Sequence, residues 1–201
     1  ITLSYEAELS NNARLSGRIE NNYIYLINDF DPTGTDSEEL LAETAYNFTN
    51  LRLSFRSNQQ KDFNFSVNPT IGQYFNGFRT GVQGNLNFRY QPFGQLSVNY
   101  AYNYFKMPYL KSSRQTILIG PRLDLTLSKS IFITTVLQYN SQIENMNLNA
   151  RLQWRFAPVS DFFLVYTDNY FTDFMNDPTN RFLTEIRNRS IVAKLTYWLN
   201  I

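Results

Sequence analysis

Side chains of alternating character mark the last stretch of the chain, residues 189–201. One phase of the alternation is apolar and consists of Ile191, Ala193, Leu195, Tyr197, Leu199 and Ile201. The other phase is mixed and consists of Val192, Lys194, Thr196, Trp198 and Asn200. A period of two is that of a β-strand with two different faces. Outer-membrane barrels turn the apolar face of their final strand to lipid and pair its edge, so this stretch predicts the closing strand of a transmembrane β-barrel.

The hydropathy of the chain excludes another class of membrane protein. Its mean hydropathy is negative, and no segment approaches the roughly 20 consecutive apolar residues that a membrane-spanning helix needs. A barrel is compatible with these values because only alternate residues of each strand are apolar. We therefore expect an all-β chain.

The residue types that are missing narrow the chemistry. The chain contains no histidine and no cysteine, so a Ser-His-Asp triad, a His-ligated zinc site and a disulfide cannot form. It has no Gly-rich phosphate loop, and its net charge of +1 does not indicate a nucleic-acid partner. Paired carboxylates remain the one catalytic alternative left open. We expect no enzyme activity, no cofactor and no metal.

The same alternation recurs in ten further segments. They cover residues 1–10, 13–28, 44–57, 63–71, 82–90, 96–104, 117–127, 131–140, 147–156 and 162–167. The phase changes between Phe48 and Leu51, which predicts a β-bulge near Thr49 and Asn50. Most segments are longer than the five or six residues typical of globular proteins, and long enough to cross hydrocarbon at a tilt. About eleven antiparallel strands are predicted.

The predicted connections alternate between short and generally longer. The short ones are residues 11–12, 58–61, 91–94, 128–130 and 157–161. The others are residues 29–43, 75–78, 105–114, 140–146 and 168–188. Short periplasmic turns and longer extracellular loops are typical of transmembrane barrels. The alternative is a soluble antiparallel barrel or sandwich.

We expect residues 1–201 to form a single barrel segment. The odd number of predicted strands leads to a further expectation about this segment. If the short turns are periplasmic, the first and last strands run in the same direction and Ile1 lies outside. Single-chain bacterial barrels normally have an even strand number. We therefore expect the chain to be the C-terminal part of a larger barrel.

Several segments resemble one family of proteins. They are residues 30–35 (FDPTGT), 74–77 (YFNG), 119–124 (IGPRLD), 137–142 (LQYNSQ), 152–158 (LQWRFAP), 165–168 (VYTD) and 194–199 (KLTYWL). In this order they resemble the end of a family of large Bacteroidota surface proteins, over about residues 13–201. The resemblance implies an outer-membrane β-barrel domain of unknown function, preceded by a sandwich similar to family-nine carbohydrate-binding modules. It implies no catalytic residue, and glycan binding would belong to the sandwich.

Charged side chains fall in the polar phase of the predicted strands. They are Arg89, Arg122, Asp124, Arg151, Arg155 and Lys194. Facing a lumen, these charges would select solutes or hold a plug. The alternative is a cross-strand network of ion pairs that only satisfies the interior.

Two long polar segments are candidates for extracellular contacts. The first contains Asp29, Asp31 and Asp36 with Glu38 and Glu39, whose oxygens could bind calcium, although their spacing is not that of an EF-hand. The second, residues 168–188, places Tyr170 and Phe174 among Asp and Asn, where they could contact a partner or a glycan. The alternative for both is an ordinary surface loop.

Aromatic residues near the strand ends are candidates for interfacial belts, where an amphipathic ring lies between lipid and water. They are Tyr23, Tyr25, Tyr90, Tyr100, Tyr104, Tyr166, Tyr197 and Trp198.

The leading hypothesis is a barrel in the bacterial outer membrane that anchors a surface protein and contributes a lumen for solute passage or glycan handling. Its partners would be the lipid bilayer and lipopolysaccharide. One alternative is an accessory barrel subunit of a larger cell-envelope complex, in contact with a partner protein. Another is a soluble ligand-binding barrel.

Overall fold

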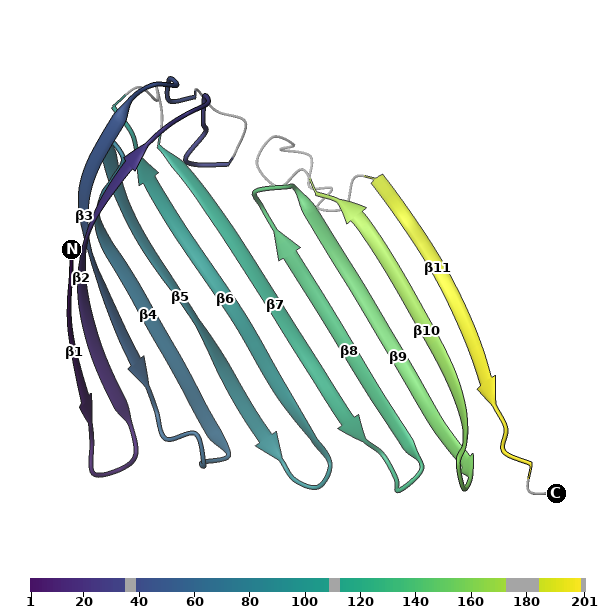
Figure 1. Cartoon of the computed structure of the whole chain (residues 1–201). Helices are drawn as coiled ribbons and strands as arrows, with labels where there is room; N and C mark the ends of the chain where they lie inside the picture. The colour runs from purple at the N-terminus through teal and green to yellow at the C-terminus, as the bar shows by residue number, and fades with distance from the viewer. Residues whose placement is uncertain (35–38, 109–112, 173–184, 200–201) are drawn as a thin grey trace. The chain divides into compact units, whose positions relative to one another are not determined.

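The computed structural model describes residues 1–34, 39–108, 113–172 and 185–199, and these form eleven strands and no helix. All strands belong to one sheet in the order β1 to β11, and each strand pairs with its neighbours in sequence (Figure 1). The strands are β1 (Thr2–Glu8), β2 (Arg14–Tyr25), β3 (Ala45–Arg56), β4 (Phe63–Tyr74), β5 (Gly77–Tyr90), β6 (Gly94–Lys106), β7 (Arg114–Thr126), β8 (Ile131–Asn140), β9 (Asn145–Ala157), β10 (Ser160–Phe171) and β11 (Glu185–Thr196). The predicted all-β class and strand number are confirmed, and the sheet is open because β1 and β11 each have one neighbour.

Two compact units make up the chain. The first consists of Ile1–Leu86 and Tyr100–Ile117, and the second of Asn87–Asn99 and Leu118–Ile201. Each unit is described by itself. Within the described residues, no helix has the length and apolar character that crossing a membrane requires.

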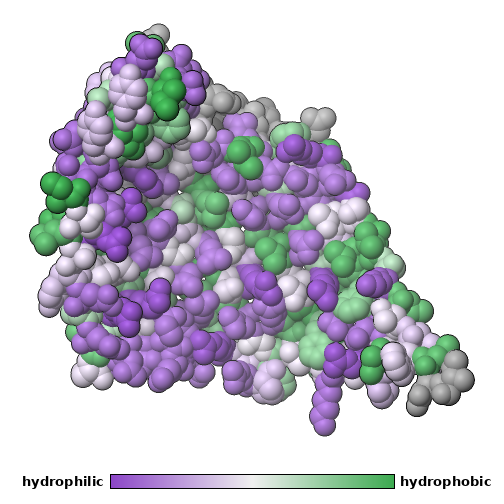
Figure 2. Space-filling view, viewed as in Figure 1, coloured by the Kyte–Doolittle hydropathy of each residue, from purple (hydrophilic) through white to green (hydrophobic). Residues whose placement is uncertain are grey.

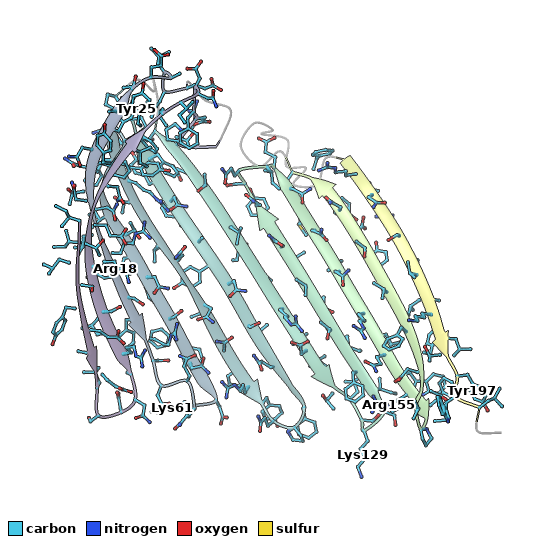
Figure 3. The ribbon with its side chains drawn as sticks, viewed as in Figure 1. Arg18, Tyr25, Lys61, Lys129, Arg155 and Tyr197 are labelled. Carbon is cyan, nitrogen blue, oxygen red and sulfur yellow. The ribbon has the colours of Figure 1, made fainter. Side chains whose placement is uncertain are left out.

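The predicted alternation of connection lengths holds only in part. Residues 26–44 and 107–113 are longer than the connections before and after them, and so is the connection from β10 to β11. The connection from β4 to β5, in contrast, is only Phe75 and Asn76, and residues 141–144 join β8 to β9. Lys61 and Lys129 lie in short connections of the first and second unit (Figure 3).

In the first unit, the register of β1 to β4 separates apolar from polar side chains. Leu3 lies opposite Ile19, and Ile19 opposite Leu51, so these residues share one face of the sheet. Arg18 lies opposite Arg52 on the other face. We call these the apolar face and the polar face.

The second unit divides in the same way. Leu152 lies opposite Ile133 and Leu164, and Leu164 lies opposite Ala193, which defines its apolar face. Its polar face carries Arg151, opposite Thr134 and Val165. The predicted two-faced character of the strands is therefore confirmed in both units.

The bulge predicted near Thr49 and Asn50 is wrong. β2 and β3 pair without interruption from Arg14 and Arg56 to Tyr25 and Ala45. The apolar phase changes because Phe48 belongs to the polar face and is buried there with Leu26, Leu40 and Phe75, not because the backbone shifts. Ring contacts join this cluster, which we call the aromatic cap, to Phe30, Tyr46 and Tyr74.

The strand ends differ from the prediction at the end of the chain. β10 continues to Phe171, so Asp168 and Tyr170 lie in a strand and not in a loop. β11 begins at Glu185 and ends at Thr196, before Tyr197 and Trp198. Trp198 is held after the strand by a hydrogen bond from its backbone N–H to the Ser160 hydroxyl, at 3.1 Å.

Candidate functional site

A hollow of about 380 Å³ lies in the first unit, and polar side chains of β2 to β6 dominate its lining. We call it the arginine hollow after Arg18, Arg52 and Arg79, which line it together with Asn68, Thr70 and Asn103. A second hollow of about 200 Å³ shares Arg52, Thr70 and Arg79 with it and reaches Phe48 of the aromatic cap and the adjoining Tyr74. The two hollows therefore adjoin each other, and the second lies beside an apolar cluster.

Arg79 of β5 is fixed from three sides. Its Nε and Nη2 atoms donate to the Asn103 side-chain oxygen at 3.1 and 2.7 Å. Its guanidinium lies 5.5 Å from the centre of the Tyr74 ring and 5.6 Å from that of Phe105, within the range of cation–π attraction. Its position is thus set by neutral groups.

Asn103 is itself held in place by Thr116. Its side-chain amide donates to the Thr116 hydroxyl at 3.1 Å, so its oxygen is turned toward Arg79. Gly81 leaves the room for this arrangement, because a Cβ atom there would lie 2.6 Å from the Asn103 side-chain oxygen.

Arg18 and Arg52 share one carboxylate. Glu20 forms an ion pair with Arg18 at 3.4 Å and a second one with Arg52 at 3.2 Å. Both arginine side chains remain more than half exposed, whereas Glu20 is largely covered. Figure 3 labels Arg18 on β2, and hydrophilic residues cover much of the surface seen in Figure 2.

The charged residues predicted to face a lumen all lie in the second unit, and several are paired there. Arg122 forms a two-pronged ion pair with Asp124, with contacts of 2.8 and 3.0 Å, and the Thr134 hydroxyl donates to the same carboxylate at 2.7 Å. Arg155 lies 3.4 Å from Asp161. These contacts are of the kind expected from the alternative interpretation, a network of ion pairs.

The other residues of this prediction have different surroundings. The Arg151 guanidinium lies 4.7 Å from the centre of the Phe163 ring, and Lys194 lies opposite Phe163 in the register. Arg89 lies near the end of β5. None of them lines the arginine hollow.

The predicted extracellular candidates are spread over turns and strands. Asp29 accepts a hydrogen bond from the Ala42 backbone at 2.7 Å, and Asp31 accepts one from the Thr33 backbone at 2.7 Å, which are local turn contacts. Tyr170 lies in β10, whereas Asp36 and Phe174 lie outside the described residues. Within the described part of the chain, no group of three His, Cys, Asp or Glu side chains is placed to hold a metal ion.

The residues that form the hollow were missed because each one looks ordinary in its own strand. Arg18, Arg52 and Arg79 are separated by about thirty residues along the chain and come together only through the pairing of β2 to β5. The available signal was the polar phase of each strand, which holds all three arginines. No protein-family model, curated protein or solved structure matches the chain.

Proposed function

We propose that the chain forms part of an outer-membrane β-barrel, with its apolar face toward lipid and its polar face toward a water-filled or plugged lumen. In this role it anchors a surface protein and contributes a path for solutes. In such a barrel the apolar face contacts lipid and the polar face contacts the lumen.

The observation that supports this proposal best is the exposure of large apolar side chains along the apolar face. Leu3, Ile19 and Leu53 are exposed in the first unit, and Leu164, Ile191 and Leu195 in the second. A soluble sheet would bury such rows against a second layer. Lipid removes the need for that layer, because the bilayer itself is the apolar medium.

The lengths of the strands support the same function. β2 has 12 residues and β5 has 14, which correspond to about 40 Å and more at the rise of a strand. A tilted transmembrane strand needs about 9 to 11 residues. The strands are therefore long enough to cross hydrocarbon and to extend beyond it.

Aromatic side chains at strand ends provide the expected interfacial anchors. In the second unit, Tyr90 stacks on Phe93 beside a short connection, and Phe156 stacks on Tyr197 beside another. In the first unit, Tyr23 and Tyr25 are exposed at the C-terminal end of β2, where Figure 3 labels Tyr25. Such rings favour the boundary between lipid and water.

A barrel of this kind needs every edge paired, because lipid offers no hydrogen bonds to a free strand edge. The proposal therefore requires partners for the outer edges of β1 and β11. These partners complete the wall in the membrane.

Membrane fractionation and conductance test the proposal. We expect the protein to stay with the outer membrane after alkaline washing and to require detergent for extraction. Protein that stays in aqueous buffer without detergent contradicts the proposal. Stable channels in planar bilayers support a solute path, whereas silent membranes with a co-purifying protein support an accessory subunit of an envelope complex.

A further inference from the structure

We propose that the arginine hollow binds a small molecule that carries an oxyanion, namely a carboxylate, phosphate or sulfate group, and that Arg79 is its main contact. This inference concerns the first unit alone. It stands on the geometry of the hollow and does not require the chain to conduct solutes.

Arg79 is a charge without a counter-charge among the described residues. Among the described residues no carboxylate lies within ion-pair distance of Arg79, whose contacts are the Asn103 oxygen and two aromatic rings. Holding a partly buried guanidinium without a counter-charge costs free energy. Sites that bind anions accept this cost because a positioned guanidinium recognises an oxyanion through two parallel hydrogen bonds.

The lining of the hollow has the charge that an anion requires. Arg18, Arg52 and Arg79 line it, and no Asp or Glu does. The one carboxylate in contact with the first two arginines, Glu20, neutralises a single charge. A concave surface with an excess of positive charge raises the local concentration of anions.

The size and polarity of the space define the class of ligand. The arginine hollow has a volume of about 380 Å³, which is at the lower end of the range for small-molecule sites. The adjoining hollow adds about 200 Å³. Amide and hydroxyl groups of Asn68 and Thr70 can bind hydroxyl groups of the ligand. A monosaccharide with an acidic group fits this description, with Tyr74 and Phe48 along one side.

Calorimetry on the full folded chain in detergent micelles tests the proposal. The ligands are glucuronate, inorganic phosphate and, as the neutral control, glucose. We expect glucuronate, phosphate or both to bind, with affinity that falls as salt rises, and glucose not to bind. If only one anion binds, the result identifies the recognised group as a carboxylate or a phosphate. If neither anion binds, the proposal is overturned.

Three variants assign the binding to Arg79. Arg79→Gln is expected to weaken binding at least about tenfold, the loss expected for a hydrogen bond to a charged group. Asn103→Asp keeps the size of the side chain but gives Arg79 an internal carboxylate, so it is expected to weaken binding as well. Arg151→Gln removes the same charge from the polar face of the second unit and is the matched control.

The pattern among the variants decides the outcome. Loss in Arg79→Gln and Asn103→Asp with retention in Arg151→Gln supports the site. Equal loss in all three overturns it, because the binding would then follow net charge alone. Circular dichroism checks the strand content of each variant, and Asn103→Asp provides the test if Arg79→Gln does not fold.

Discussion

At the scale of single residues, two charged side chains of the second unit lie on its apolar face. Asp168 of β10 and Arg189 of β11 lie opposite each other on the apolar face of the second unit, next to the pair of Tyr166 and Ile191 along the strands. Arg189 donates to one Asp168 oxygen through Nε at 3.0 Å and Nη2 at 2.8 Å. The hydroxyl groups of Tyr166 and Tyr170 donate to the same oxygen, and Asp168 is only 1% exposed. Four hydrogen bonds thus converge on one oxygen of this carboxylate, which offsets the cost of burying its charge.

This pair gives the first prediction. Arg189→Leu is expected to destabilise the protein strongly, because it leaves the buried Asp168 carboxylate without its cation. Replacing both residues with Leu is expected to recover much of the loss, since both charges of this pair are then absent from the apolar face. The measurement is the urea midpoint of unfolding in lipid vesicles. A double variant as unstable as the single one contradicts this account.

A second prediction concerns two glycines of the first unit. A Cβ atom on Gly84 would lie 2.0 Å from the Ser66 backbone oxygen and 2.7 Å from the Tyr100 hydroxyl oxygen, whereas one on Gly17 would meet only a Leu53 methyl group at 3.4 Å. Gly84→Ala is therefore expected to cost about 1–3 kcal/mol through overpacking. Gly17→Ala, the matched control, is expected to be neutral or slightly stabilising. Equal effects of both in urea unfolding would argue against the close approach at Gly84.

At the scale of elements, the strands follow the alternation in the sequence, whereas one connection contributes two residues to the buried apolar cluster of the first unit. Residues 26–44 contribute Leu26 and Leu40 to the aromatic cap, and Phe30 and Leu40 exchange backbone hydrogen bonds of 3.0 and 2.8 Å. Phe75 lies at its centre, with ring centres of Phe48 and Tyr74 at 5.2 and 5.0 Å. The cap thus ties this connection to the ends of β3 and β4.

Phe75→Ala is the third prediction. Truncation of this buried ring is expected to cost about 3–5 kcal/mol and to expose residues 26–44 to protease. Phe93→Ala is the control, because Phe93 is exposed and stacks mainly on Tyr90. Proteolysis followed by mass spectrometry locates the cleavage. Resistance of residues 26–44 in Phe75→Ala would contradict the role of the cap.

At the scale of the whole molecule, the sheet has two faces of different chemistry and only a small buried apolar core. Among the described residues, the buried apolar side chains are Ala13, Leu26, Leu40, Phe48, Phe75, Phe105 and Met107. A soluble chain of this length buries far more apolar surface to offset its conformational entropy. The proposed lipid environment supplies the missing burial.

Two adjacent residues of β11 provide the fourth prediction. Ile191 is 69% exposed on the apolar face and Val192 is 56% exposed on the polar face. If both faces were in water, an arginine would be tolerated at both positions. In a bilayer, Ile191→Arg is expected to cost about 2–4 kcal/mol and to reduce insertion into vesicles, whereas Val192→Arg inserts normally. Insertion is measured by protection from protease and by heat-modifiable gel mobility. Equal behaviour of the two variants argues against a membrane.

The sequence alone determined the strands and their faces, because each alternation is local and every strand pairs with its neighbours in order. It predicted β5 to β9 within a few residues at most ends, and it predicted that Ile191, Ala193 and Leu195 share a face. Its errors lie where long-range contacts decide. Phe48 breaks the alternation to join the aromatic cap, and Tyr170 lies in β10 because it pairs with Met146 of β9 and Ile186 of β11.

The tertiary structure alone decided which polar residues act together. Arg18, Arg52 and Arg79 converge only when the register of β2 to β5 is fixed, and Gly81 matters only because Asn103 lies against it. Alternation along one strand assigns a side chain to a face but not to neighbours across strands. The physical reason is that strand pairing is set by backbone hydrogen bonds and by packing over the whole sheet, which no single segment contains.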